Sequence, residues 1–169
     1  MVLVPGGQTD QDYCMTVSYQ PLNARLKRDA FPLPDVHGIL DRVASFPWYS
    51  QLDLKAGFHA IPMSACSEPL LAFCTPDGHW TWTRMPIGLA TAPNHFQAAM
   101  NSILDGVLFK WCVVYLDDVT VFANSWEECW QRTQDIIQIL GSAGITLSAS
   151  VRGHVWSPSI GHNVSRLQR

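Results

Sequence analysis

Residues 111–123 place two adjacent carboxylates, Asp117 and Asp118, inside an apolar run of β-branched and aromatic residues. Val, Tyr, Thr and Phe favour strands and Asp favours turns, so the run predicts a tight hairpin with both aspartates at its bend. Two carboxylates held this close repel each other and attract a hard cation such as Mg²⁺. The pair alone is more typical of an ordinary turn, in which Asp is common for local reasons.

A third carboxylate favours a metal site over an ordinary turn. Asp53 ends a strand-like run that starts at Trp48 and is followed by a bend containing Gly57. Two-metal phosphoryl transfer uses such a set, because carboxylates hold the two ions roughly 3.5–4 Å apart. Asp53, Asp117 and Asp118 are therefore candidate ligands of two divalent ions. We expect them to converge on neighbouring antiparallel strands.

The elements that must position these aspartates are a mixture of helices and hairpins. Apolar spacing predicts three helices, at residues 34–43, 93–108 and 125–140. Three further segments predict strands, at residues 13–19, 70–75 and 80–84, the last two joined by a turn at 76–79. Trp126 and Trp130 lie on the predicted inner face of the last helix. Hairpins without regular strand–helix alternation indicate an α+β fold with an antiparallel sheet packed on helices.

The amino-acid composition limits the classes of protein to which this chain can belong. A chain of 169 residues, 47% of them apolar, allows one or at most two domains with a real core. The five cysteines and six histidines show no metal-ligand spacing, which predicts neither a zinc site nor a disulfide framework and fits a reducing compartment. No signal peptide or membrane-spanning run is visible, so we expect a soluble, intracellular protein without a membrane partner. The net charge of −3 is unexpected for a nucleic-acid binder.

Three motifs follow one another along the chain: Leu52-Asp53-Leu54-Lys55, Met85-Pro86-Ile87-Gly88 and Tyr115-Leu116-Asp117-Asp118. In order and spacing they resemble the reverse transcriptase of gypsy-type long-terminal-repeat retrotransposons, from about residue 12 to Ser165. The resemblance implies the fingers and palm of a right-hand polymerase, as one domain over residues 1–169. Such a domain is a fragment of a polyprotein whose thumb, ribonuclease H and integrase regions lie outside this chain.

The resemblance also implies an activity and its partners. The enzyme would be an RNA-directed DNA polymerase, a nucleotidyltransferase that uses two Mg²⁺ or Mn²⁺ ions to extend a primer 3′-hydroxyl. Its partners would be an RNA or DNA template with primer, deoxynucleoside triphosphates and the remainder of the polyprotein. The implied location is the cytoplasm, within the particle of the parent element, with the nucleus as the alternative.

Individual residues take roles from the same resemblance. Asp53, Asp117 and Asp118 match the catalytic, metal-binding carboxylates, with the backbone carbonyl of Leu54 as a further ligand. Residues expected to contact the nucleotide or template are Leu54, Phe58, Met85, Pro86, Ile87, Gly88 and Tyr115. Gly161 and His162 match a hairpin that grips the primer. For Phe58 and Tyr115 the alternative is a purely structural aromatic residue.

Several positions depart from the family pattern. The family has Arg where Cys14 stands, Asp at Ser18 and Arg at Gln20, and the first of these arginines contacts the nucleotide triphosphate. A lysine-rich loop is missing at residues 5–12, and the segment that would supply a proton donor aligns near residues 150–152 without its lysines. A charge-assisted hydrogen bond is worth roughly 1.5–3 kcal/mol, so we expect an impaired enzyme. The alternative function is a catalytically silent nucleic-acid-binding or structural remnant.

Overall fold

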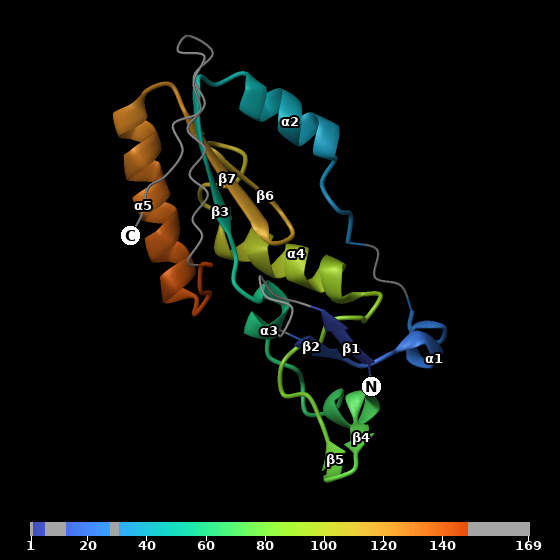
Figure 1. Ribbon diagram of the computed structural model, residues 1–169. Helices are drawn as coiled ribbons and strands as arrows, with labels where there is room; N and C mark the ends of the chain where they lie inside the picture. The colour runs from blue at the N-terminus through green and yellow to red at the C-terminus, as the bar shows by residue number, and fades with distance from the viewer. Residues whose placement is uncertain (1, 6–12, 28–30, 149–169) are drawn as a thin grey trace. The chain divides into compact units, whose positions relative to one another are not determined.

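The computed structural model describes residues 2–5, 13–27 and 31–148 (Figure 1). Contacts within the chain separate it into two units. One unit comprises residues 1–30 and 58–95, and the other comprises residues 31–57 and 96–169. Within the described ranges, no helix is long and apolar enough to span a membrane.

The second unit is built on a three-stranded antiparallel sheet. Its strands are β3 (Trp48–Asp53), β7 (Asp118–Ala123) and β6 (Cys112–Tyr115), in the order β3-β7-β6. Helix α5 (Trp126–Ser142) packs along β3 and β7 (Figure 1). Helix α2 (Val36–Ala44) precedes β3, and its N-cap residue Asp35 accepts bonds from the backbone of His37 and Gly38.

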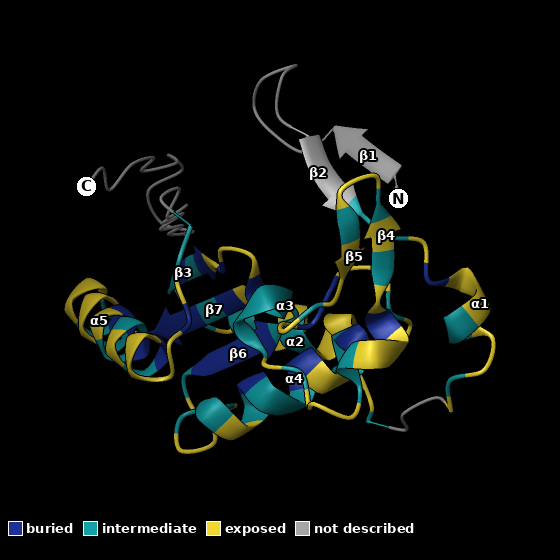
Figure 2. Ribbon diagram, turned by 90° about the horizontal axis from the view of Figure 1, so that it is seen from below, coloured by how far each residue is buried: buried dark blue, intermediate teal, exposed yellow. Residues whose placement is uncertain are grey.

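The core of this unit lies between the sheet and its helices. Figure 2 shows β6 and β7 largely buried and much of α5 exposed. The β-branched residues that favour strands here, such as Val113, Val119 and Val121, are almost fully removed from solvent. Phe96 and Met100 of α4 (Ala92–Ile103) and Ile136 of α5 are likewise fully buried.

The first unit consists of short elements. Strands β1 (Val2–Pro5) and β2 (Tyr13–Thr16) pair antiparallel, as do β4 (Phe73–Thr75) and β5 (Gly78–Trp80). The short helices are α1 (Gln20–Asn23), α3 (Gly57–Ala60, from Phe58 onward in this unit) and the 3₁₀-helix η1 (Glu68–Leu71). A bridge between Pro62 and Arg84 joins the segments on either side of the β4–β5 hairpin.

Several element boundaries differ from the sequence expectation. Leu70 and Leu71 lie in η1 rather than in a strand, because Pro69 sits in the first turn of a short helix. Strand β5 covers Gly78–Trp80, so Gly78 and His79 lie in it rather than in the turn, and of the strand expected at residues 80–84 only Trp80 belongs to it, with an isolated bridge at Arg84. Helix α4 ends at Ile103, five residues before the expected end at Leu108, and buried Leu104 follows in a turn.

The last helix begins as expected, and Thr133 and Leu140 of its expected inner face are buried, but the two tryptophans expected on that face are not. Ser125 accepts a bond from the Glu128 backbone (3.2 Å), as in a capping box, and the Glu128 carboxylate accepts one from the backbone of Asn124, the residue before the N-cap (3.1 Å). Trp126 and Trp130, expected in the core, are 37% and 43% exposed and stack on each other. The sheet instead contacts the neighbouring helical positions, and the buried residues are Cys129, Thr133, Ile136 and Leu140.

Candidate active site

The three aspartates lie at one end of the β3-β7-β6 sheet. Asp53, the last residue of β3, is paired with Asp118, the first residue of β7. The backbone nitrogen of Leu54 donates to the carbonyl of Asp117 at 3.0 Å, so the chain segments remain joined just beyond that pair. The expected convergence on neighbouring antiparallel strands is therefore confirmed for Asp53 and Asp118, and Asp117 directly precedes Asp118.

The β6–β7 turn consists of two residues, Leu116 and Asp117, and Asp118 already belongs to β7. The expectation that both aspartates occupy the bend is therefore wrong for Asp118. Leu116 has a positive φ of 52°, and Ala56, just beyond Asp53, has a φ of 51°. Residues with a Cβ rarely adopt this backbone region, and such strain persists only where the surroundings enforce it. Both strained positions flank the carboxylates.

The side chain of Gln97 in α4 stabilises the strained β6–β7 turn through hydrogen bonds. Its side chain is fully buried, and its Nε2 donates to the Val114 carbonyl (3.1 Å) and to Asn101 Oδ1 (2.9 Å). Its Oε1 accepts a bond from the backbone nitrogen of Leu116 (2.9 Å). Sequence reasoning missed Gln97 because it looked only for apolar residues in this helix. The only signal available was the position of this amide directly after Phe96 in a helix with an apolar face.

Removing these bonds should destabilise the protein. In Gln97→Leu a side chain of similar size leaves the Leu116 nitrogen and Val114 carbonyl without partners, so we expect the free energy of unfolding to fall by about 1–3 kcal/mol. Urea denaturation measures the loss. Gln134→Leu, at an exposed position of α5, is the matched control. Equal stability of the two variants would show that the turn does not depend on Gln97.

Asp117 differs electrostatically from the other two aspartates. Asp53 and Asp118 are exposed, whereas Oδ1 of Asp117 is buried and has no hydrogen-bond partner. Burial, followed by the negative charges of Asp53 and Asp118, raises the pKa of Asp117 above its ordinary value. An ionised carboxylate in this position is therefore short of a positive partner.

Gly57 provides the space for this carboxylate. A Cβ at position 57 would overlap Oδ1 of Asp117 and approach Cζ of Phe96 to 2.8 Å. The sequence indicated a close approach at Gly57, and the structure shows that the approaching group is the Asp117 side chain. The bend expected after Asp53 therefore provides the space that the carboxylate of Asp117 occupies.

The pKa of Asp117 predicts a pH dependence of stability. Because the folded protein raises this pKa, ionisation of Asp117 opposes folding, and this cost disappears as pH falls through the folded pKa toward the unfolded value of about 3.9. Asp117→Asn lacks the cost. Without metal ions, the variant should be more stable than the wild type near pH 7, and its advantage should vanish near pH 3. Thermal unfolding across this pH range tests the sign, and a constant difference would contradict it.

The donor set suits a hard divalent ion. Carboxylate oxygens and a backbone carbonyl are the ligands that Mg²⁺ prefers, and Asp117 Oδ1 is an unsatisfied buried oxygen. Among the described residues, no three His, Cys, Asp or Glu side chains already stand as a metal-binding cluster. Oδ1 of Asp118 instead accepts a bond from Gln51 Nε2 at 3.0 Å.

Leu54, the expected backbone ligand, is buried beside the aspartates and bridges to Leu147. The hydrogen bonds of this bridge run from Lys55 to Thr146 and from Ser148 to Asp53, both at 2.9 Å, so neither uses the Leu54 carbonyl. Tyr115 lies at the end of β6, opposite Asp118. Both residues are therefore brought to the aspartates.

The remaining expected nucleotide- and template-contacting residues belong to the first unit. Phe58 is half-buried, Met85 and Pro86 are buried, and Ile87 is 47% exposed. Gly88 has a φ of 104°, which favours glycine, and its carbonyl accepts a bond from Asn23 at 2.8 Å. Asn23 also accepts a bond from the Ala90 backbone at 2.9 Å. Sequence reasoning missed Asn23, which fixes this segment from α1.

Some expected residues cannot be placed in the site. Gly161, His162 and the segment around residues 150–152 lie outside the described residues. Cys14 lies in β2, where its backbone pairs with Val4, and Ser18 and Gln20 are exposed.

The comparisons with known proteins decide the family. A family model described as reverse transcriptase (RNA-dependent DNA polymerase) matches residues 11–150. The chain belongs to this reverse transcriptase family. Members of the family are nucleotidyltransferases and generally use divalent metal ions.

Relatives and solved structures agree with this membership. The chain is 36% identical over 135 residues to the genome polyprotein of Petunia vein clearing virus, covering 80% of this chain and 6% of that protein. It is 34% identical over 164 residues to the retrovirus-related Pol polyprotein from transposon 297 of Drosophila melanogaster, covering 91% and 16%. The chain thus spans less than a fifth of either relative.

Two foamy virus enzymes share the fold. The native prototype foamy virus protease–reverse transcriptase has a TM-score of 0.78 and 27% identity, covering 92% of this chain and 20% of that one. The foamy viral protease–reverse transcriptase in complex with RNA/DNA hybrid has a TM-score of 0.75 and 26% identity, covering 86% and 19%. The expected α+β fingers-palm fold, with its antiparallel sheet packed on helices, is confirmed.

Proposed function

We propose that this chain is the fingers-palm part of a reverse transcriptase of the gypsy type, encoded in a long-terminal-repeat retrotransposon. The observation that carries the proposal is the pairing of Asp53 with Asp118 beside the unsatisfied carboxylate of Asp117. The gypsy assignment rests on the order of the three motifs and draws support from relatives named as transposon polyproteins. We expect the chain to act in the cytoplasm, together with the remainder of its polyprotein.

The proposed reaction joins a deoxynucleoside triphosphate to a primer. The primer 3′-oxygen forms a bond to the α-phosphorus, the bond from that phosphorus to pyrophosphate breaks, and the hydroxyl proton passes to solvent water. Asp53, Asp117, Asp118 and the Leu54 carbonyl would hold two divalent ions, which supply positive charge for the attacking and leaving oxygens. The raised pKa of Asp117 and its buried, unpartnered oxygen favour a cation at this position.

Other residues would position the substrates. We assign Phe58 to the sugar of the incoming nucleotide, where its ring would exclude a 2′-hydroxyl. Met85 to Gly88 would support the nucleotide and template, and Tyr115 would lie near the primer end. Gly161 and His162 would contact the primer backbone. A structure of a relative bound to RNA/DNA hybrid supports a nucleic-acid duplex as the partner.

Primer extension tests this function. The chain is fused to the thumb of a close relative and supplied with an RNA template, a DNA primer, nucleotides and Mg²⁺. We expect addition of the nucleotide that the template specifies, at a low rate because Cys14 replaces an arginine. The alternative, a silent nucleic-acid-binding remnant, is not favoured by the relatives, which are named as a Pol polyprotein and a reverse transcriptase. It would be supported if the fused chain bound the primer-template but added no nucleotide, even after Cys14→Arg.

A further inference from the structure

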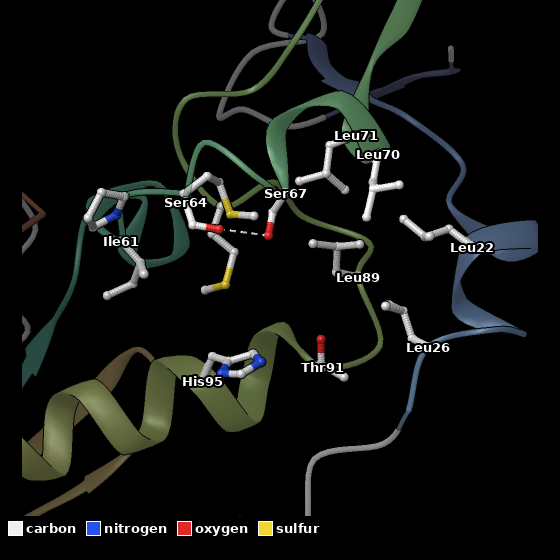
Figure 3. A pocket seen from close by; sticks show the side chains of 13 residues that line it. Leu22, Leu26, Ile61, Ser64, Ser67, Leu70, Leu71, Leu89, Thr91 and His95 are labelled. Carbon is white, nitrogen blue, oxygen red and sulfur yellow. Dashed lines mark hydrogen bonds between the residues drawn. The ribbon is translucent and has the colours of Figure 1, made fainter.

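A pocket of about 450 Å³ lies within the first unit. Of the residues that line it, only Met85 has a role in the proposed function. Its walls come from four stretches of chain: residues 22–26, 61–71, Met85 with Leu89, and 91–95. Figure 3 shows their side chains arranged around an open centre. A hollow lined by several chain segments is typical of a small-molecule site and not of a flat protein interface.

The lining is mostly apolar, its polar side chains are Ser64, Ser67, Thr91 and His95, and the two serines are bonded to each other. Leu22, Leu26 and Leu71 provide aliphatic walls. Ser64 and Ser67 point into the pocket, with their hydroxyl oxygens bonded to each other at 2.9 Å (Figure 3). The Ser67 backbone nitrogen also donates to the Ser64 carbonyl at 2.8 Å, so a local turn fixes this hydroxyl pair. Each hydroxyl has capacity for further hydrogen bonds to a bound molecule.

Hydrogen bonds made by the lining residues hold the walls of the pocket in place. The hydroxyl of Tyr19 donates to the Leu71 carbonyl at 3.1 Å. The backbone nitrogen of Met85 donates to the Ile61 carbonyl at 2.9 Å, and that of Met63 donates to the Thr83 carbonyl at 3.0 Å. A ligand entering this pocket would therefore spend little free energy on ordering its walls, which favours binding.

We infer that this pocket binds a small, mostly apolar ring compound with a single hydroxyl group. The apolar walls favour the rings through hydrophobic contact, and the Ser64–Ser67 pair favours the hydroxyl group through hydrogen bonding. An apolar cavity of roughly 150 Å³ takes one benzene molecule, so the pocket has room for about two or three rings. Apart from Met85, the lining residues have no assigned part in the proposed polymerase chemistry, and the test does not require an active enzyme.

Two ring compounds of similar shape test the inference on the full chain. 2-Naphthol carries the hydroxyl and 2-methylnaphthalene does not, and ligand-observed NMR titration measures the affinity of each. We expect both to bind, with 2-naphthol binding more tightly. The double variant Ser64→Ala, Ser67→Ala should weaken 2-naphthol by about three- to tenfold, the worth of one hydrogen bond, and leave 2-methylnaphthalene unchanged.

A second variant tests the location. Leu70 lines the pocket yet is 64% exposed, so Leu70→Trp should fold and obstruct binding of both compounds. Leu40→Trp, at a 58% exposed position of α2, is the matched control and should bind both normally. Unchanged affinities in Leu70→Trp and the double serine variant would overturn the inference. Failure of both compounds to bind the wild type would also overturn the inference. The pocket would then be a place that accommodates a protein side chain.

Discussion

Replacing Asp118 with Asn is expected to slow templated nucleotide addition by about a hundred- to a thousandfold. This is the usual effect of removing one preorganised electrostatic group from an active site, about 2.7–4 kcal/mol of barrier. The substitution keeps the shape of the side chain and the backbone pairing with Asp53, so it changes mainly one negative charge. Primer extension by the thumb-fused chain carrying Cys14→Arg provides the measurable starting rate.

Asp105→Asn is the matched control for this loss. Asp105 is an exposed aspartate in the turn after α4, outside the proposed site, and its replacement should leave the rate unchanged. Thermal unfolding of both variants shows that each still folds. A rate for Asp118→Asn within about threefold of the parent would contradict a catalytic role, because so small a change is worth less than one ordinary hydrogen bond.

Cys14→Arg is expected to tighten nucleotide binding by about ten- to a hundredfold. A guanidinium offers a planar set of donors that matches phosphate oxygens, and a charge-assisted bond is worth roughly 1.5–3 kcal/mol. Cys14 lies in strand β2, at the position where the sequence resemblance implies an arginine that contacts the triphosphate. The Michaelis constant for the nucleotide, measured in primer extension, reports the change.

The variant Cys14→Lys distinguishes the effect of a positive charge at position 14 from the effect of the planar shape of a guanidinium. Lysine adds the same charge without the planar fork, so we expect it to recover only part of the affinity. Efficient extension by the chain with Cys14, with no gain from Arg, would show that the departures from the family pattern do not impair this copy.

The fold was predictable where one physical signal dominated. The β-branched run before Asp117 and Asp118 predicted the β6–β7 hairpin, and the capping box at Ser125 predicted the start of α5. Trp126 and Trp130 misled the prediction because helical spacing identifies a shared face without showing whether the sheet covers it.

The placement of the three aspartates was predictable and that of the residues supporting them was not. Asp53 was expected beside the other two because three acids near strand ends suit two-metal chemistry, and the structure pairs it with Asp118. Gln97 and Asn23 act through single amide side chains that bond to distant backbone groups, and no periodic pattern marks such contacts. The positive φ of Leu116 is equally invisible, since Leu has no preference for that region and only the packed turn enforces it.

Binding of Mn²⁺ tests the central claim, that the three aspartates hold divalent ions. The full chain is titrated with Mn²⁺, and electron paramagnetic resonance measures the ion left free in solution. We expect the wild type to bind the ion and Asp117→Asn to lose most of this binding. Gly57→Ala should lose it too, because its added Cβ displaces the Asp117 carboxylate, while Asp105→Asn should bind as the wild type does. No binding by the wild type, or equal binding by all four proteins, would contradict the account.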